Sequence, residues 1–286
     1  MKVKVFNIPH ELKNYILKIS FFESNSGLPD PNDMMLVAPS GLVRLVIPCN
    51  NNLSLRNDEW LQLAKEDKMM LIGIHDLPIV VDFEKGHPSA LLQVEFSPLG
   101  AYRFFHLRQT EIKNRSFPVS DILDKSAPGI EERIVNTADI DVKIKLLTQF
   151  LLYYFEKSDN DLIFEHCVNR IINSHGNVSI EQLATETGYS GRWLNMKFKE
   201  RLGLNPKSLC SILRFHLFYS AIMIQDEEIL KSKAFFDFYY DQAHFIKDFK
   251  RFTGFTPGLF ESTNNNFCRL FYMAQYTPEA LKIRLL

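Results

Sequence analysis

The sequence is poor in the features that mark metal proteins and membrane proteins. Its four cysteines, which are Cys49, Cys167, Cys210 and Cys268, form no CxxC pair and no cluster with histidine at metal-ligand spacing, which argues against a zinc site. No stretch approaches the roughly 18 apolar residues that a membrane span needs. The N-terminus has no continuous apolar signal core, because polar residues interrupt it. These absences favour a cytosolic protein with reduced thiols and no membrane partner.

Large net charge is also absent. The chain of 286 residues is 46% hydrophobic and 23% charged, with a formal net charge of -1, which is typical of a globular protein. Residues 1–160 hold 18 basic and 21 acidic side chains, and residues 161–286 hold 15 and 13. The second half has the sign expected of a nucleic-acid-binding region, but its excess is small, so any basic patch must be local.

The first half lacks a catalytic or metal-binding motif. Its histidines are His10, His75, His87 and His106. No two of them have the His-x-His spacing that places two ligands on one strand face, which favours scattered loop histidines over a metal site. Arg44, Glu95 and Arg103 are either recognition groups for a small ligand inside a barrel or surface residues. We predict a protein that is not an enzyme, with no catalytic residue, no metal and no cofactor, and we assign no cofactor-binding residues.

Short β-rich runs fill residues 1–118, and turn clusters such as "ESNSGLPDPND" and "CNNN" separate them. Runs such as "GLVRLVIPC" and "HPSALLQVEFSP" at this spacing predict a small barrel or sandwich. We therefore expect an α+β protein whose first domain is a cupin-like β-barrel or sandwich; the family resemblance given below implies that this domain senses an effector or regulates the second one.

The hydrophobic period changes from strand-like to helical after residue 118. We expect a helical linker over 119–160, with apolar residues of its helix 141–157 at helical spacing: Ile144, Leu147, Leu151, Tyr154 and Phe155. This stripe is either a dimerisation surface or the face that packs on the β-domain. The polar "KSDND" ends the linker. An all-α domain follows over 161–262, and the tail 263–286 is expected to be helical.

Two stretches of the second half repeat each other at an offset of 51 residues. They are "GYSGRWLNMKFKERLGLNP" (188–206) and "YYDQAHFIKDFKRFTGFTP" (239–257). The matching residues of the first copy are Leu194, Phe198, Lys199, Gly203 and Pro206, and those of the second are Phe245, Phe249, Lys250, Gly254 and Pro257. Self-similarity at a fixed offset indicates two copies of one supersecondary unit.

Each copy is predicted to be a helix-turn-helix unit. In the first, Ser179 is an N-cap with Gln182 three residues later, Gly188 supplies the turn, and Ser190 caps a second helix that runs to about Leu202. The units cover about 179–202 and 229–253, with Asp241 as the cap of the second reading helix. A long helix over 206–224 joins the units, which would place their second helices in successive major grooves.

The second helix of each unit has a buried face and a polar outer face, because successive residues rotate by about 100°. Leu194 and Phe198 face inward in the first unit, and Phe245, Phe249 and Phe252 face inward in the second. The predicted DNA-binding residues are Arg192, Asn195, Met196 and Lys199 in the first unit and Gln242, Ala243, Lys247 and Lys250 in the second. Ile246 also faces outward. Arginine can bond guanine, asparagine can bond adenine, and lysine neutralises phosphate.

The basic side chains of both reading helices are expected to contact DNA as a set, with a merely solvated face as the alternative. The set is Lys197, Lys199, Arg201, Lys247, Lys250 and Arg251. His244 lies on one helix side with Asp241 and Asp248, and we expect it to support the structure rather than act as a base.

Residues 161–262 resemble the C-terminal region of the AraC/XylS family of bacterial transcription regulators. The family's second-unit signature is approximately G-F-x-D-x-x-H-F-x-x-x-F-K-x-x-x-G-x-x-P, and the chain has "FYYDQAHFIKDFKRFTGFTP". Phe238 stands where the family usually has glycine, Lys233 replaces a usual aliphatic residue, and Met196 stands at an often polar reading position. The resemblance implies a sequence-specific DNA-binding transcription regulator in the cytoplasm. Its implied partners are double-stranded DNA, RNA polymerase, a second copy of the chain and a small-molecule effector.

Two other functions fit parts of the sequence. One is an enzyme or metal-binding β-domain that uses the C-terminal half as a targeting module. The other is a protein-interaction module that binds DNA weakly through an altered second unit.

Overall fold

The structure is a computed structural model that describes residues 2–24, 35–57, 61–66, 68–83, 87–123, 128–156, 161–224, 239 and 242–262. Three of the sequence-based expectations lie outside these residues: the first helix of the second helix-turn-helix unit with Lys233 and Phe238, the Asp241 cap, and the tail 263–286.

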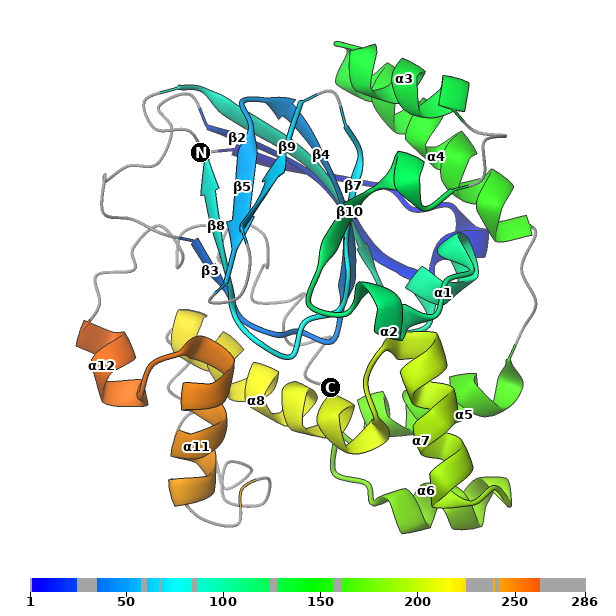
Figure 1. The fold of residues 1–286 in the computed structure, drawn as a ribbon, viewed down its shortest axis with the longest axis vertical. Helices are drawn as coiled ribbons and strands as arrows, with labels where there is room; N and C mark the ends of the chain where they lie inside the picture. Colours follow the sequence, from blue (N-terminus) through cyan, green and yellow to red (C-terminus); the bar gives the residue numbers. More distant parts are fainter. Residues whose placement is uncertain are drawn as a thin grey trace.

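The first half folds into two antiparallel sheets (Figure 1). The six-stranded sheet has the order β1 (Lys2–Phe6), β2 (Ile16–Ser24), β9 (Ser89–Phe96), β4 (Val43–Asn50), β7 (Met70–Ile72) and β10 (Ser116–Pro118). The four-stranded sheet has the order β3 (Met35–Val37), β8 (Ile79–Phe83), β5 (Leu53–Arg56) and β6 (Leu61–Ala64). The expected β-sandwich is confirmed.

The core lies between the two sheets and continues on the outer face of the larger one. Phe22 of β2 stacks on Phe83 of β8 at a centroid distance of 5.8 Å, so this face of β2 points toward the second sheet. Neighbouring residues along a strand point to opposite faces. Ile19 and its register partner Val94 are fully buried on the other face. Both faces of the larger sheet are therefore covered, which explains the long apolar runs of β4 and β9.

Four helices follow the last long strand: α1 (Gly100–Phe105), α2 (Gln109–Ile112), α3 (Pro128–Asn136) and α4 (Ile140–Glu156). Of these, α1 and α4 cover that other face, since the ring of Phe104 lies 5.0 Å from that of Phe96 and 5.8 Å from that of Phe155. Leu147, Leu151 and Tyr154 of α4 are buried, and the Phe155 ring lies 5.0 Å from the ring of Tyr15 in the β-domain. Of the two roles open for the apolar stripe of this helix, packing on the β-domain is the one observed.

The second half is helical throughout its described residues. Its helices are α5 (Leu162–Asn173), α6 (Ile180–Thr187), α7 (Gly191–Leu202), α8 (Pro206–Ile224), α11 (Gln242–Thr253) and α12 (Pro257–Ser262). In Figure 1 the long helix α8 runs between α7 and α11. The expected fold class, a β-rich domain with helices followed by an all-α domain around a long joining helix, is confirmed.

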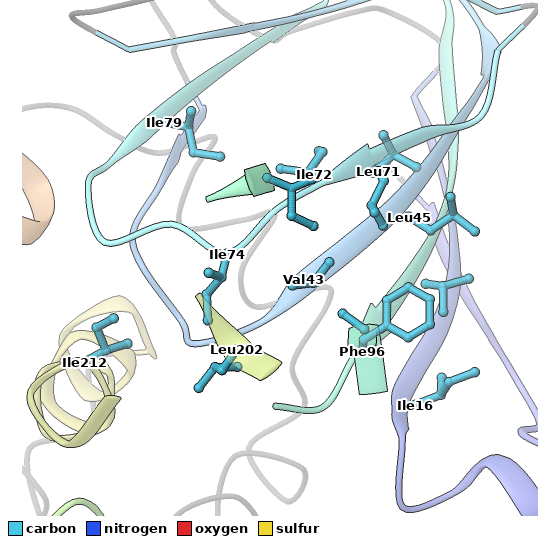
Figure 2. Packing of buried hydrophobic residues seen from close by; sticks show 14 of the residues in the cluster. Ile16, Val43, Leu45, Leu71, Ile72, Ile74, Ile79, Phe96, Leu202 and Ile212 are labelled. Atoms are coloured by element: carbon cyan, nitrogen blue, oxygen red, sulfur yellow. The ribbon is translucent and has the colours of Figure 1, made fainter. Parts of the chain in front are cut away.

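The apolar core is continuous between the two halves. Figure 2 shows Ile74, which follows β7, next to Leu202 of α7, with Ile212 of α8 nearby. All three side chains are buried and belong to one hydrophobic cluster. Gly41 lies against α8, because a Cβ at this position would meet Leu209 at 3.1 Å. The β-domain and the helical domain are thus packed together and are not separated by solvent.

A buried polar group lies inside the sandwich. The Arg44 Nε donates to Glu95 Oε1 at 3.3 Å, and the amide of Gln93 donates to the same oxygen at 3.1 Å. Arg44 also reaches the Ser40 hydroxyl at 3.0 Å. The Glu95 side chain is 1% exposed. Arg44 and Glu95 are therefore interior residues that satisfy each other, and the surface alternative is wrong for both.

His75 lies in the same region, and its charge state ties stability to pH. Burial, with the Arg44 charge as a second cause, lowers the pKa of His75 to about 3. An unfolded histidine has a pKa near 6.5, so between about pH 6.5 and 3 the unfolded chain binds a proton that the folded chain does not. Stability that is complete above about pH 6.5 is therefore lost as the pH falls.

His75→Gln removes this titrating group. We expect the free energy of unfolding of the wild type to fall by about 2 kcal/mol more than that of His75→Gln between pH 7 and pH 5, since one proton is worth about 1.4 kcal/mol per pH unit. Urea unfolding across this range measures the difference. Equal pH slopes for the two proteins would contradict the burial of a neutral imidazole.

Candidate nucleic-acid interface

The first helix-turn-helix unit forms as the sequence predicted. The Ser179 hydroxyl accepts from the Gln182 N–H at 3.1 Å, and the Gln182 side chain accepts from the Ser179 N–H at 2.8 Å, which completes a capping box. Gly188 ends α6 with a φ of 75°, a conformation that favours glycine. The Ser190 hydroxyl accepts from the Trp193 N–H at 3.2 Å and so begins α7. Local polar contacts therefore determine where the reading helix begins.

An aromatic contact holds the inner face of α7. Leu194 and Phe198 are 1% and 0% exposed, and the Phe198 ring meets the Phe164 ring of α5 edge-on at 5.0 Å. Such edge-to-face pairs are a favoured arrangement of aromatic rings. With this face buried, the rotation of α7 about its own axis is determined.

The outer face of α7 carries the first set of predicted DNA-binding residues. Arg192, Met196 and Lys199 are exposed. Asn195 is half-buried, and its amide nitrogen donates to the Gly191 carbonyl at 2.8 Å. One amide hydrogen of Asn195 is thus engaged within the helix.

The reading helix of the second unit, α11, packs in the same way. The Phe215 ring of α8 lies 5.7 Å from that of Phe249 and 4.9 Å from that of Phe252. The outward residues, all exposed, are Gln242, Ala243, Ile246, Lys247 and Lys250. Both helices end at a left-handed glycine, at Gly203 with a φ of 82° and at Gly254 with a φ of 83°. The 51-residue repeat is therefore a structural repeat, while DNA contact by these residues stays a prediction.

Two of the six basic residues point into the chain. The Asp161 carboxylate lies 3.2 Å from Lys197 Nζ and 3.4 Å from Arg201 Nε, and Arg201 also lies over the Tyr102 ring of α1 at 3.7 Å. Both basic side chains are 19% exposed. An acid and an aromatic ring therefore engage these two basic side chains within the protein, and DNA contact by the set stays a prediction.

The inward orientation of Lys197 and Arg201 could have been predicted from their positions on the inner flank of α7. Lys197 follows Leu194 by three residues, and Arg201 follows Phe198 by three, so each shares a helix side with a buried residue. Their partners could not have been predicted from the sequence, because Asp161 and Tyr102 are distant from them along the chain.

A second polar contact joins α11 to the β-domain. Asp76 lies 2.6 Å from Lys113 Nζ and 3.8 Å from Arg251 of α11. Burial would raise the pKa of Asp76, but hydrogen bonds from Lys113 and Asn114 together with the charge of Arg251 outweigh it and lower the pKa. Arg251 remains 47% exposed. Both reading helices are therefore linked to the β-domain by charged groups beside, and not on, the predicted reading face.

His244 and Asp248 join the helices of the second half. The Asp248 carboxylate accepts from the Ser211 hydroxyl of α8 at 2.9 Å and lies 3.8 Å from His244. Asp248 is 7% exposed. The Asp248 carboxylate anchors α11 on α8, while His244 is 43% exposed on the same helix, so its supporting role stays a prediction.

Arg103 is a third contact between the two halves. Its guanidinium lies 4.8 Å from the rings of both Tyr15 and Phe155 and 3.9 Å from the Glu165 carboxylate of α5. Glu165 also accepts from the Tyr15 hydroxyl at 3.3 Å. Arg103 is 8% exposed, so the surface alternative is wrong for this residue too.

Thiols and metal-binding side chains form no second site among the described residues. Burial raises the pKa of Cys49, and it raises the pKa of Cys167 and of Cys210 to about 11. No group of three or more His, Cys, Asp and Glu side chains gathers in the described part of the chain. None of the helices described is both long enough and apolar enough to span a membrane.

Comparison with known proteins gives structural likenesses alone. No protein-family model matches the sequence, and neither does any curated protein. ToxT from Vibrio cholerae O395 aligns with 88% of this chain and 99% of its own, at 14% identity and a TM-score of 0.44. The AraC-like transcriptional activator CuxR aligns with 76% of this chain and 86% of its own, at 14% identity and a TM-score of 0.26. A Cupin_2 domain of an XRE family regulator from Enterobacter cloacae covers 34% of this chain and 95% of its own, at 14% identity and a TM-score of 0.27.

Likenesses at this identity concern the fold alone. A β-sandwich precedes the helices α7 and α11, which repeat at an offset of 51 residues and end at equivalent glycines. This order of a β-rich domain and a helical domain is the fold class that the sequence predicted.

The two helix-end glycines offer a matched test of the domain contact. A Cβ at Gly203 would meet the Gln109 carbonyl oxygen of α2 at 2.8 Å, whereas one at Gly254 would meet nothing within 4 Å. Each alanine carries a left-handed backbone cost of about 1–2 kcal/mol. We expect Gly203→Ala to lower the free energy of urea unfolding by at least about 1 kcal/mol more than Gly254→Ala, because α7 must also shift from α2.

Equal losses for Gly203→Ala and Gly254→Ala would show that α7 does not pack on α2 in solution. Limited proteolysis of the two variants provides an independent measure, since loss of the contact between α7 and α2 makes the chain easier to cleave.

Proposed function

We propose that this chain is a sequence-specific transcription regulator of the AraC type that binds double-stranded DNA through α7 and α11. The observation that carries the proposal is the structural repeat, in which two helices bury apolar residues at equivalent positions, end at equivalent glycines and expose the equivalent lysines Lys199 and Lys250. A helix with a buried inner face and an exposed Arg or Lys outer face is what reading a major groove requires.

The joining helix α8 supports simultaneous binding by both units. Its 19 residues correspond to about 28 Å at 1.5 Å per residue. Successive major grooves on one face of a duplex are roughly 34 Å apart. The helix α7 precedes the first residue of α8, and α11 packs on the middle of α8 through Phe215 and Phe218. A single rigid helix that contacts both units is proposed to hold the two reading helices at a fixed separation shorter than its full length.

Docking on the β-domain leaves the reading faces open. Arg192, Met196 and Lys199 are exposed, while Arg201, on the flank of the same helix, lies over the Tyr102 ring of α1. The exposed residues of α11 lie likewise outside the contact between Arg251 and Asp76. DNA binding therefore requires no separation of the two domains.

The β-domain is proposed to sense an effector, to dimerise, or to do both. Its polar interior supports this role, because Arg44, Glu95 and Gln93 place charge and hydrogen-bonding groups inside an otherwise apolar sandwich. Ligand sites commonly combine apolar walls with a few such groups. We further propose that the protein acts in the cytoplasm and that RNA polymerase is its partner at promoters.

Selection of bound duplexes from a random pool tests the DNA-binding proposal. We expect an enriched motif with two parts about one helical turn apart, because two helix-turn-helix units on one face of a duplex enter successive major grooves. Sequencing of the recovered pool gives the motif. Enrichment of a single half-site would show that one unit alone reads bases, and no enrichment would refute the function.

Arg192→Ala is expected to lower affinity for the selected duplex by roughly 1–3 kcal/mol and to remove the preference at one base pair, since a bidentate guanine contact is lost. Lys199→Ala should weaken binding to all sequences and reduce the salt slope by about 1, because its contact is with phosphate. Titrations at several salt concentrations separate the two effects. Arg133→Ala, which removes an exposed charge on α3, is the matched control and should bind as the wild type does.

A further inference from the structure

Each reading helix exposes one large apolar side chain at its centre. Met196 of α7 is 58% exposed and Ile246 of α11 is 37% exposed. Met196 lies between Arg192 and Lys199 on the outer face, and Ile246 lies between Gln242 and Lys250. Residues three or four apart on a helix are neighbours on its surface, so each apolar side chain lies inside the predicted DNA-binding surface.

The side chains around Met196 and Ile246 are mostly lysines, which suit phosphate contact, or lack a second free donor for a base edge. Asn195, beside Met196, already donates to the Gly191 carbonyl. Ala243, one turn before Ile246 and Lys247, has no polar side-chain atom. The side chains with free donors suited to base edges are at the start of the helices, at Arg192 and Gln242. The centre of each reading face is therefore built for an apolar contact.

The major groove offers one apolar group on its base edges, the C5-methyl group of thymine. We propose that Met196 and Ile246 each contact a thymine methyl group, so that both halves of the operator contain a required thymine. This inference rests on the proposed function and specifies the DNA that it takes. Arg192 and Gln242 then read the base pairs next to these thymines, and the lysines contact the phosphates.

Packing on the inner side holds each apolar residue in place. Phe198, two residues after Met196, is fully buried against Phe164. Phe249, three residues after Ile246, is fully buried against Phe215. A helix that cannot rotate keeps its outer residues at one depth in the groove, which a contact with a single methyl group demands.

Deoxyuridine tests the contact directly, because it lacks the methyl group of thymine and keeps the same hydrogen-bonding edge. The probes are duplexes recovered from the random pool, with one thymine of each half-site replaced by deoxyuridine in turn. We expect the replacement at the contacted position to weaken wild-type binding about fourfold, as loss of one buried methyl group predicts.

Variants assign each methyl contact to its side chain. Met196→Gln should bind the thymine and deoxyuridine duplexes equally at the first half-site and keep the preference at the second, and Ile246→Gln should show the reverse. Met196→Leu retains an apolar side chain and should keep the preference. Lys199→Ala is the control, since it should weaken binding to both duplexes by the same factor.

Two results would overturn the inference while leaving the proposed function intact. One is equal wild-type affinity for thymine and deoxyuridine duplexes at every position of a motif that is still selected. The other is a thymine preference that persists in both Met196→Gln and Ile246→Gln. A pool that yields no enriched duplex overturns the proposed function and this inference with it.

Discussion

Burial of aromatic rings on the inner sides of α7 and α11 is the interaction on which both reading faces depend. Phe198 packs on Phe164, and Phe249 and Phe252 pack on Phe215. Each ring removes a large apolar area from water, which stabilises the contact by roughly 1.5–3 kcal/mol per side chain. Because a helix has a single rotation that buries these rings, the same burial decides which polar residues face outward.

The joining helix turns two local reading faces into one surface. The Phe215 ring of α8 packs on the Phe252 ring of α11, and Asp248 of α11 accepts a hydrogen bond from Ser211 of α8. An apolar contact and a buried polar one thus bind the same pair of helices, and the polar contact adds direction to an interaction that apolar burial leaves non-directional. The orientation of the second reading helix is consequently as well defined as its rotation.

Contacts between the domains make the reading helices part of the whole molecule. Gly203 allows α7 to approach the backbone of α2, Arg201 lies over the Tyr102 ring of α1, and Asp76 reaches Arg251. Such buried or half-buried ion pairs hold position strongly, because removing one partner leaves the other charge poorly solvated. The β-domain therefore contacts α11 at Asp76, the neighbour of His75, through Arg251, and it contacts α7 at Tyr102 through Arg201.

Local rules of the sequence determined the elements and the outer faces. The capping box at Ser179, the glycine ends and the spacing of Leu194 and Phe198 each follow from contacts within a few residues, so the first unit and the helix α11 were predictable. The tertiary structure alone decided the rest. In the folded chain the apolar stripe of α4 packs on the β-domain, Arg44 pairs with Glu95, and Lys197 and Arg201 pair with Asp161. These outcomes depend on which distant segments meet, and a charged side chain has the same sequence signature whether it meets an acid, an aromatic ring or a phosphate.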